Sequence, residues 1–413
     1  MSNAELTADE VRQSHRHIRR RKVLAVMFVA PLLLFIFVTF VAPIGTMLYR
    51  SFYHPTVAEL IPDTLAELDD WTADSGQLPP RETLNIFTLE LKLLANERLS
   101  GKLAEEINRA LPGASSLIKS TARRLRRVDD AELQSQGAAR LFEVRDDWQQ
   151  VEVWQAIKKS GAVFKTDFYL TALDLERTPA GEIVQRDTQI YLQLYWKSLK
   201  IAFYITALTA LIGFPLAWYL ANASTRVANT LMILVLLPFW TSLLVRTTAW
   251  IALLQTNGVI NSTLISLFII DQPLEMLYTE FATVIAMTHI LLPFMVLPLY
   301  SVMKGIDPSY FRAALSLGAR PVPAFIRIYL PMTVPGLSAG ALLVFIISIG
   351  YYITPALVGG TEGQMISNLI AFHMQSSNNW ELAAALGSLL LLLITVLYWL
   401  YDRLVGISNL KLG

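Results

Sequence analysis

The sequence predicts an all-α polytopic membrane protein: six transmembrane helices, with a mainly helical soluble insertion between the first two. Composition is one reason, because 54% of the 413 residues are hydrophobic and only 16% are charged, giving a mean hydropathy of +0.45. Soluble globular domains carry about 25% charged residues. The other reason is a series of stretches without Asp, Glu, Lys or Arg, each close to the roughly 20 apolar residues that cross a bilayer.

The composition also excludes several classes of function. The chain contains no cysteine, which rules out disulfides, thiolate metal sites and cysteine nucleophiles. Five scattered histidines offer little material for a metal site, so no metal is expected. The net charge of +1 is unlike the basic face of a nucleic-acid-binding protein, and no nucleic-acid partner is expected.

Six uncharged stretches are long enough to predict spans. The first contains 27 residues, beyond the roughly 7–15 apolar residues of a secretory signal, which predicts an uncleaved membrane helix. After the third stretch an uncharged segment continues to residue 270, but several polar residues interrupt it. Unpaired polar groups are costly in lipid, so this segment is expected to be interfacial or re-entrant. The predicted spans are residues 23–49, 201–225, 227–245, 281–303, about 334–357 and 382–401.

Basic residues in the short loops predict the orientation, because basic flanks resist translocation. The tail 1–22 carries six Lys and Arg residues directly before the first span, which predicts that it is cytoplasmic. Alternation of the spans then places the loop 304–332 and the tail 404–413 on the same side. The loops at about 249–280 and 358–381, on the opposite side, contain no Lys or Arg. We therefore expect both termini in the cytoplasm.

Residues 50–196, between the first two predicted spans, have an ordinary soluble composition. Long loops are translocated largely regardless of charge, so this insertion is expected outside the cytoplasm. Helical spacing of apolar residues recurs at 89–94, 103–111 and 148–157, with Gly and Pro between these segments. We expect a small helical domain that acts either as a solvated cap or as a contact for a soluble partner protein.

The loop between the fourth and fifth spans has the most informative local pattern. Pro308 stands where a helix can begin, Gly318 where one can end, and Pro321 where continuation is prevented. The pattern predicts an Ala-rich cytoplasmic helix of about two to three turns. Its small residues allow another backbone to approach closely, so the helix suits a groove on a cytoplasmic partner.

This loop resembles the EAA loop of bacterial ABC importer permeases, which reads Glu-Ala-Ala, three residues, Gly, nine residues and Ile-x-Leu-Pro. One position departs from the pattern, because Arg312 stands where the family has Glu, so the partner surface must tolerate a cation there. Leu315 lies within the same short helix. The positions that match the family spacing are Ala313, Ala314, Gly318, Ile328, Leu330 and Pro331.

Two further segments, 237–247 and 354–360, look like the spermidine/putrescine branch of these permeases. The resemblance covers about residues 191–413 and the first span, including a permease core at 197–403, but it does not cover the insertion. It implies the type I ABC importer permease architecture in the bacterial inner (cytoplasmic) membrane.

The resemblance also implies partners and a mechanism. Such importers combine two permeases, two cytoplasmic ABC ATPase subunits and a periplasmic solute-binding protein, and the analogy favours a second permease that is a different chain. The segment from Arg312 to Gly318 would dock on an ATPase subunit and pass its closure to the membrane helices. This chain has no Gly-x-x-x-x-Gly-Lys-Ser/Thr phosphate loop. We therefore expect no cofactor and no catalysis in this chain, with ATP and Mg on the partner ATPase.

Candidate residues of a translocation path lie near the ends of the third and fifth spans. Arg246 stands between Trp240 and Trp250, where an indole face would stabilise its guanidinium by about 0.5–2 kcal/mol. The alternative is that Arg246 only extends to the membrane interface. Tyr351 and Tyr352 either line a path or belong to an aromatic belt.

His289, in the fourth span, is expected to be a hydrogen-bonded packing residue rather than a proton relay. The acidic residues of the membrane half all fall in loops or at span ends, so no carboxylate is expected at mid-membrane to accompany a polyamine. A zwitterionic amine, such as an omega-amino acid, fits better than spermidine, and both remain candidates for the carried solute.

Other classes of function compete with the importer permease. The main alternative is a secondary transporter driven by an ion gradient, but such proteins show internal repeats and intramembrane ion ligands, and neither is visible in the sequence. A membrane-anchored sensor would need a cytoplasmic signalling domain, whereas few residues follow the last predicted span. A membrane enzyme would need a catalytic constellation inside the spans, which His289 and one arginine do not make.

Overall fold

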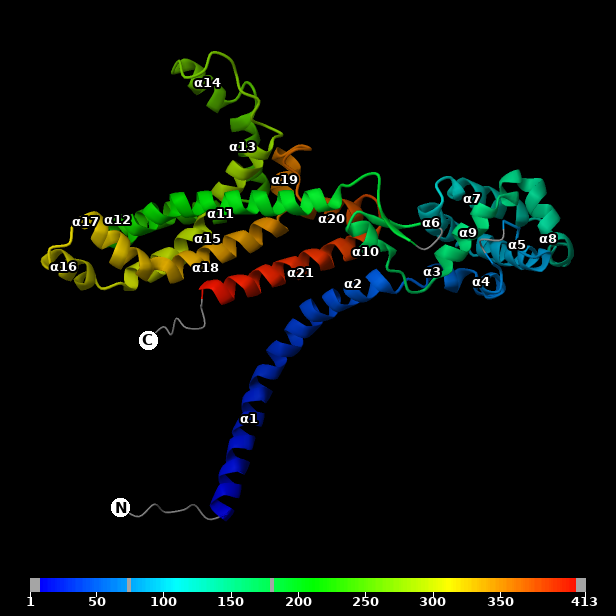
Figure 1. The fold of residues 1–413 in the computed structure, drawn as a ribbon, viewed down its shortest axis with the longest axis horizontal. Helices are drawn as coiled ribbons and strands as arrows, with labels where there is room; N and C mark the ends of the chain where they lie inside the picture. Colours follow the sequence, from blue (N-terminus) through cyan, green and yellow to red (C-terminus); the bar gives the residue numbers. More distant parts are fainter. Residues whose placement is uncertain (1–7, 73–75, 179–181, 406–413) are drawn as a thin grey trace. The chain divides into compact units, whose positions relative to one another are not determined.

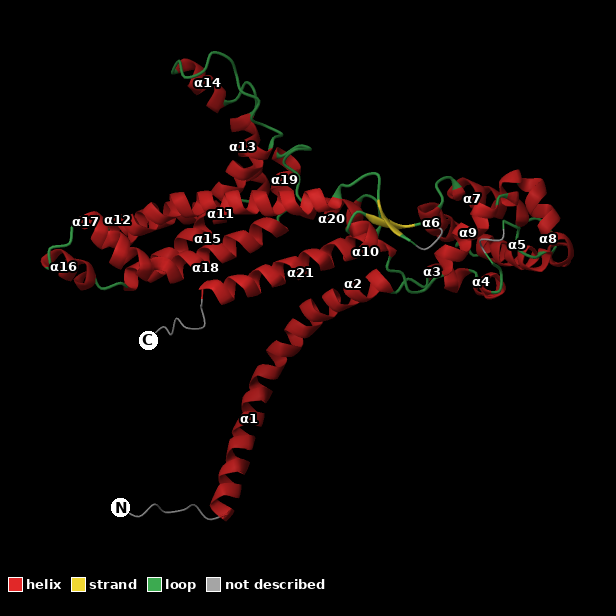
Figure 2. Cartoon of the chain, viewed as in Figure 1, coloured by secondary structure: helices red, strands yellow, loops and turns green. Residues whose placement is uncertain are grey.

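The computed structural model describes residues 8–72, 76–178 and 182–405, which are mainly helical (Figure 2). The predicted all-α fold class is therefore confirmed. The chain divides into two compact units, residues 1–166 and 167–413. Figure 1 follows the chain through both units, from blue at the N-terminus to red at the C-terminus.

The first unit begins with a membrane helix that contains one π-helical turn. Its segment Leu24–Phe52 is long and apolar enough to cross a bilayer, as predicted for residues 23–49. Pro43 has no N–H for the α-helical ladder, and the π-helical turn lies directly before it. The basic tail predicted at 1–22 lies largely outside the residues whose side chains are described. The elements are α1 (Ala8–Ile36), the π-helix η1 (Phe37–Val41) and α2 (Ala42–Phe52).

Short helices follow and form a domain with its own core, which confirms the helical insertion. Tyr53 pairs with Phe164 in an isolated bridge, so the chain enters and leaves the domain at one place. At its centre the Phe87 ring lies 5.2 Å from the rings of both Trp148 and Trp154. The helices are α3 (Thr56–Leu60), α4 (Pro62–Asp69), α5 (Arg81–Asn96), α6 (Ser100–Ala110), α7 (Ala114–Leu125), α8 (Asp130–Val144), η3 (Asp146–Gln149) and α9 (Val151–Gly161).

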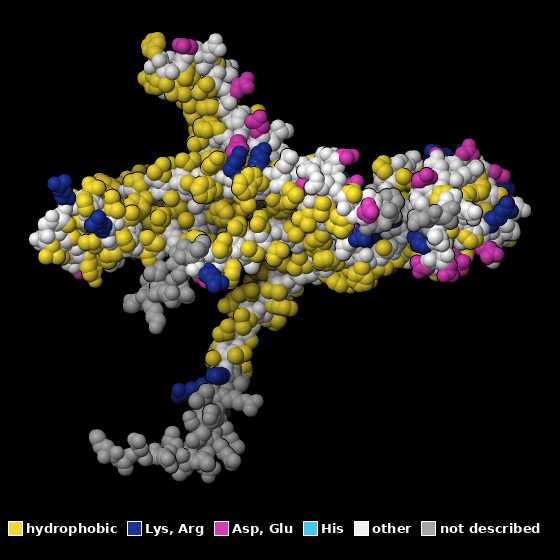
Figure 3. Space-filling model, viewed as in Figure 1, with side chains coloured by type: hydrophobic (Ala, Val, Ile, Leu, Met, Phe, Trp, Pro, Cys, Tyr) yellow, Lys and Arg dark blue, Asp and Glu magenta, His cyan; other side chains and the backbone are white. Residues whose placement is uncertain are grey.

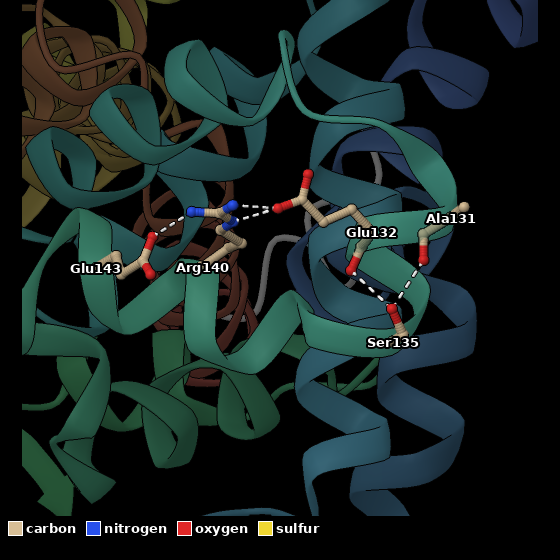
Figure 4. A network of polar contacts seen from close by, with 5 residues as sticks. All are labelled: Ala131, Glu132, Ser135, Arg140 and Glu143. Carbon is tan, nitrogen blue, oxygen red and sulfur yellow. Dashed lines mark hydrogen bonds and ion pairs between the residues drawn. The ribbon is translucent and has the colours of Figure 1, made fainter.

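Helix α8 is bent at Gln136, where φ is −131°. The bend brings Glu132 and Arg140 together, although eight residues span about 12 Å of a straight helix. Arg140 Nε donates to Glu132 Oε1 at 2.6 Å, and its Nη1 donates to Glu143 Oε2 at 2.6 Å (Figure 4). Asn85 of α5 accepts a backbone N–H that the bend frees, at 2.8 Å. The bend therefore leaves this backbone group satisfied.

Glu90 makes the stability of this domain depend on pH. Its buried carboxylate accepts the backbone N–H groups of Asp63 and Thr64 at 2.9 and 3.0 Å. Burial raises the pKa of Glu90 above its ordinary value of 4.5, against the opposing effect of these hydrogen bonds. The folded state therefore holds the proton to a higher pH than the unfolded state. This contribution to the free energy of unfolding is full below pH 4.5 and is lost as the pH rises through the folded pKa.

We expect Glu90→Gln to remove this pH dependence, because glutamine does not titrate. The measurement is hydrogen–deuterium exchange of α5 peptides in the full-length protein, with variant and wild type compared at each pH. The exposed Glu67→Gln is the control and should keep the wild-type profile. If the exchange rates of the wild type and Glu90→Gln were equal at every pH, Glu90 would not be the source of the pH dependence.

The second unit contains the remaining helices and a small hairpin. Its elements are α10 (Asp167–Ala172), β1 (Leu175–Arg177), β2 (Ile183–Gln185), α11 (Tyr191–Asn222), α12 (Thr225–Trp240), α13 (Leu243–Leu254), α14 (Val259–Ser266), α15 (Glu280–Gly305), α16 (Pro308–Ser316), α17 (Pro321–Ala324), the π-helix η4 (Phe325–Tyr329), α18 (Leu330–Gly350), α19 (Ile353–Val358), α20 (Ile366–Gln375) and α21 (Trp380–Val405). Strands β1 and β2 pair antiparallel, with Leu175 opposite Gln185. Before them, the Asp174 carboxylate accepts the N–H groups of Tyr191 and Leu192 at 3.1 and 2.8 Å and so caps α11.

Helices α11, α15 and α18 lie side by side at the centre of this unit (Figure 1). Gly336 and Gly340, four residues apart on α18, face α15. A Cβ at Gly336 would meet the backbone of Pro298 and Leu299 at 2.9 and 3.1 Å. Such small residues let membrane helices approach closely. The visible face of these helices is mostly hydrophobic, and Lys and Arg side chains lie at the α16 end (Figure 3).

The described residues contain five single helices and one bent pair that can cross a membrane. If the bent pair counts as one span, the total equals the six predicted. The helices are Leu24–Phe52, Tyr191–Asn222, Glu280–Gly305, Pro321–Gly350 and Trp380–Arg403, and the bent pair is Thr225–Trp240 with Leu243–Ser266.

The predicted third span, 227–245, is wrong at its end. Helix α12 stops at Trp240, and the bent pair that it forms with the following segment turns by 99°. Pro238 removes a backbone donor near this end, and Ser242 Oγ accepts the Val245 N–H at 3.2 Å to begin α13. Beyond the bend, α13 and α14 project from the bundle (Figure 1), in agreement with the interfacial or re-entrant segment expected there.

The fifth span also differs from its prediction. It was expected at 334–357 after a loop at 304–332, whereas the structure has one long helix, Pro321–Gly350. Pro321 stands at the first helical position, where its missing N–H has no intrahelical partner to lose. It therefore begins a helix instead of ending one.

The boundary of the insertion is the third correction. The prediction placed the insertion at 50–196, but the first unit ends at Thr166. Helix α10 packs against α21, and α11 already begins at Tyr191, so residues 167–196 belong to the membrane unit. The tail predicted at 404–413 lies largely outside the described residues.

Candidate coupling helix and translocation site

Helix α16 begins with the cap that its sequence favours. The Asp307 carboxylate accepts the Ser309 N–H at 2.8 Å, which satisfies one of the free donors of the first turn. This hydrogen bond lowers the pKa of Asp307. Pro308 follows at the first helical position, where no N–H is needed. The predicted start of the helix is confirmed.

The end of α16 depends on Gly318, whose φ is +88°. Glycine adopts this left-handed conformation without the clash that a Cβ would cause. The Gly318 N–H donates to Leu315 O at 3.0 Å, and the Ala319 N–H donates to Ala314 O at 3.1 Å. These two bonds form a Schellman motif. The predicted end of the helix is also confirmed.

Most of the surface of α16 is exposed. Ala314 is buried, whereas Arg312, Ala313 and Ser316 are exposed. Leu317, at the end of the helix, is 89% exposed. An exposed apolar side chain beside small residues is a suitable contact for another protein, so the docking role of this helix stays a prediction.

The other residues of the loop pattern connect α16 to a membrane helix. Ile328 lies in η4, and Leu330 and Pro331 begin α18. A cavity of about 320 Å³ lies between α16 and the adjacent ends of α11 and α15, and its wall includes Lys304 and Arg312. The pattern thus runs from the exposed helix directly into the helix that contains the fifth span.

A polar cluster forms where α13, α15 and the end of α18 meet. Trp250 Nε1 of α13 donates to His289 Nδ1 of α15 at 3.3 Å, with the two ring centroids 5.7 Å apart. Arg246, one turn before Trp250, interacts electrostatically with His289 and with Tyr351, which follows α18. The structure therefore brings together three of the five predicted path residues. It adds His289, whose hydrogen bond was expected but whose place beside Arg246 was not.

The other two predicted path residues, Trp240 and Tyr352, lie outside this cluster. Trp240 lies before the bend and is 73% exposed, while Tyr352 contributes its carbonyl, which accepts a side-chain amide of α20 at 2.7 Å. In the part of the chain that the structure describes, the cation–π pair is Arg403 over the Trp399 ring, at 5.6 Å. The expectation that an indole face holds Arg246 is wrong. The bend lies between Trp240 and Arg246, and the Trp250 indole donates its hydrogen bond to His289.

The backbone around the cluster is held by side chains. Thr247 and Thr354 are buried, and their hydroxyl oxygens lie 3.3 Å apart, which joins α13 to α19. Where α18 ends, Ser367 Oγ donates to the Tyr351 carbonyl at 2.7 Å. An unsatisfied backbone group is costly inside a membrane. These bonds therefore stabilise the broken segment between α18 and α19.

Carboxylates in the spanning helices lie at the helix ends. Glu280 is the first residue of α15 and pairs with Lys200 at 2.8 Å. Glu381 and Asp402 stand near the two ends of α21. Among the described spanning helices, none carries Asp or Glu in its interior, as the sequence indicated.

The long apolar helices and the broken third span are those of a polytopic membrane protein. The family model for the "Binding-protein-dependent transport system inner membrane component" matches residues 213–406. Two curated relatives are 35% and 36% identical in sequence to this chain over their aligned residues. The chain belongs to this family of ABC importer permeases and is a multi-pass inner-membrane protein.

The relatives include the spermidine/putrescine transport system permease protein PotB of Haemophilus influenzae. It is 35% identical over 54% of this chain and 78% of that protein. PotB of Escherichia coli K12 is 36% identical over 52% of this chain and 80% of that protein. A solved structure of a bacterial ABC transporter involved in alginate import is also similar. The alignment covers 60% of this chain and 84% of the transporter chain, with a TM-score of 0.46 and 17% sequence identity.

Proposed function

We propose that this chain is the permease subunit of an ATP-driven, binding-protein-dependent importer, and that α16 is the helix that docks on its ATPase. The cap at Gly318 is the observation that carries the proposal. It ends an exposed, small-residue helix at the position where the family pattern places one. The partners we propose are two cytoplasmic ABC ATPase subunits, a second permease that is a different chain, and a periplasmic solute-binding protein.

Helix α16 is suited to transmit motion because it is joined closely to two membrane helices. Two residues separate it from the end of α15, and four separate it from Pro321, where the helix of the fifth span begins. A displacement of α16 by an ATPase would therefore move both helices. Arg312 is exposed on this surface, so the ATPase groove would offer it an acidic or neutral group. ATP and Mg would bind on the ATPase, and both termini of this chain would lie in the cytoplasm.

For the cargo, we propose a small amine-bearing solute, either a polyamine or an omega-amino acid. The PotB relatives are named for spermidine and putrescine, which supports the amine. The lack of carboxylates inside the described spanning helices disfavours a solute that carries several positive charges.

The test is affinity purification of the tagged chain from native membranes in mild detergent, with companions identified by mass spectrometry. Recovery of an ATPase subunit and a related permease is the expected result. A chain that purifies without an ATPase in several detergents would overturn the proposal that α16 docks on one.

A further inference from the structure

We propose that Arg246, His289 and Tyr351 form an anion subsite that holds a carboxylate of the carried solute. This subsite rests on the importer function proposed above. It narrows the cargo to amines that also carry a carboxylate.

The cluster lies deep in the membrane. His289 is the tenth residue of α15, so about 14 Å of helix precede it at 1.5 Å per residue. This is about half of the roughly 30 Å hydrocarbon core. The imidazole is nevertheless exposed on the surface of this chain. Polar groups at such depth face a water-filled path or another protein, because lipid does not solvate them. The cluster therefore marks a side of the chain that faces the path or a neighbouring subunit and not lipid.

Arg246 supplies a positive charge that the spanning helices do not neutralise. Its Nε atom is buried and has no hydrogen-bond partner among the described residues. The interiors of the described spans hold no carboxylate, and Glu280 at the start of α15 is already paired with Lys200 at 2.8 Å. A bound anion would supply both the missing charge and the missing acceptor.

The Trp250 indole determines which nitrogen of His289 carries the proton. Its Nε1–H donates to Nδ1 of His289 at 3.3 Å, and only an unprotonated Nδ1 can accept this bond. The imidazole is then neutral, and its Nε2–H donates to no other residue that the structure describes. Together with the Arg246 guanidinium and the Tyr351 hydroxyl, which interact electrostatically, it offers an anion several donors, and the interiors of the described spanning helices hold no competing carboxylate.

The donors stand on elements that are held in place. Thr247, next to Arg246, pairs with Thr354 of α19 at 3.3 Å. Ser367 Oγ fixes the Tyr351 carbonyl at 2.7 Å. A site that is already ordered loses less free energy on binding than a mobile one. The arrangement therefore suits a ligand that is small and must be held in one orientation.

The subsite discriminates by charge. A diamine would place a positive group beside the unneutralised guanidinium and be repelled. An omega-amino acid of the same length would pair its carboxylate with Arg246 and keep its ammonium group away from it. The expected cargo is therefore an amine with a carboxylate, in preference to a polyamine.

The test uses the complete importer in proteoliposomes with its binding protein. The probes are 4-aminobutanoate, its amide 4-aminobutanamide, which lacks the carboxylate charge but keeps the ammonium group, and 1,4-diaminobutane. Wild type should take up 4-aminobutanoate fastest. Arg246→Met should reduce this uptake on the order of 30-fold or more, because a desolvated ion pair is lost. Arg246→Lys should keep part of it. Arg226→Met, at an exposed position on α12, is the matched control and should keep the wild-type rate.

Each variant is compared at equal recovery of the ATPase subunit and equal basal ATP hydrolysis, so a misassembled complex is recognised. His289→Leu, which keeps Arg246, should also lower 4-aminobutanoate uptake and leave 1,4-diaminobutane uptake unchanged. Three results would overturn the subsite: unchanged uptake in Arg246→Met, a wild-type preference for the amide or the diamine, or no uptake of 4-aminobutanoate. ATP-driven uptake of 4-aminobutanamide or 1,4-diaminobutane would contradict the subsite but still support the importer function. Failure of the chain to bind an ATPase would contradict the importer function.

Discussion

Gly318→Ala is expected to reduce ATP-driven uptake by about 5–30-fold while the membrane helices stay folded. The φ of +88° at this residue costs an L-residue about 1–2 kcal/mol, which corresponds to that factor in an equilibrium constant. The two bonds of the Schellman motif hold the end of α16. If they are weakened, the small-residue surface loses its shape, and the docking of an ATPase proposed for this surface is expected to weaken.

The measurements are uptake and the amount of ATPase subunit that copurifies with the tagged chain. Gly305→Ala is the matched control, because a Cβ there meets nothing within 4 Å and the backbone is not left-handed. It should behave as wild type. If Gly318→Ala retained full uptake and full ATPase recovery, α16 would not be the docking helix.

Gly336→Leu is expected to destabilise the membrane unit by about 3 kcal/mol, the upper end for an overpacked interior. A Cβ at this position would lie 2.9 Å from the Pro298 carbonyl oxygen and 3.1 Å from the Leu299 Cα. Both are backbone atoms of α15, so no side chain can rotate away. Helices α15 and α18 would have to separate, and the close packing that small residues permit would be lost.

Thermal unfolding in detergent checks this second expectation, with the yield of folded protein as a further readout. Gly350→Leu is the control, because a Cβ at the end of α18 meets nothing within 4 Å. Its melting temperature should stay near that of wild type, whereas Gly336→Leu should melt several degrees lower. Equal melting temperatures for the two variants would show that the contact between α15 and α18 does not limit stability.

Helix α16 could be predicted because its boundaries are local. Asp307, Pro308 and Gly318 act within a few residues of chain, through one capping bond, one missing donor and one left-handed residue. Tertiary contacts are not needed to form them. The contact of Gly336 and Gly340 with α15 also has a local signal, two glycines four residues apart, although it was not among the predictions.

The polar cluster could be predicted only in part. Arg246 and Trp250 are one turn apart, so their proximity follows from helical spacing. His289 lies 39 residues after Trp250, and no local pattern connects them. The expected contact of Trp240 with Arg246 failed because the 99° bend between α12 and α13 lies between them, and that of Trp250 failed because its indole donates to His289.

The sequence by itself determined the number of apolar segments, the helical insertion and the capped helix between two spans, because hydrophobic length and local capping act over short distances along the chain. Only the tertiary structure decided that residues 167–196 join the membrane unit, and that His289 of α15 meets Trp250, one turn from Arg246 on α13. These features depend on which helices pack together. Packing joins residues that are far apart in sequence, and the sequence around Trp250 and His289 carries no local signal of their contact.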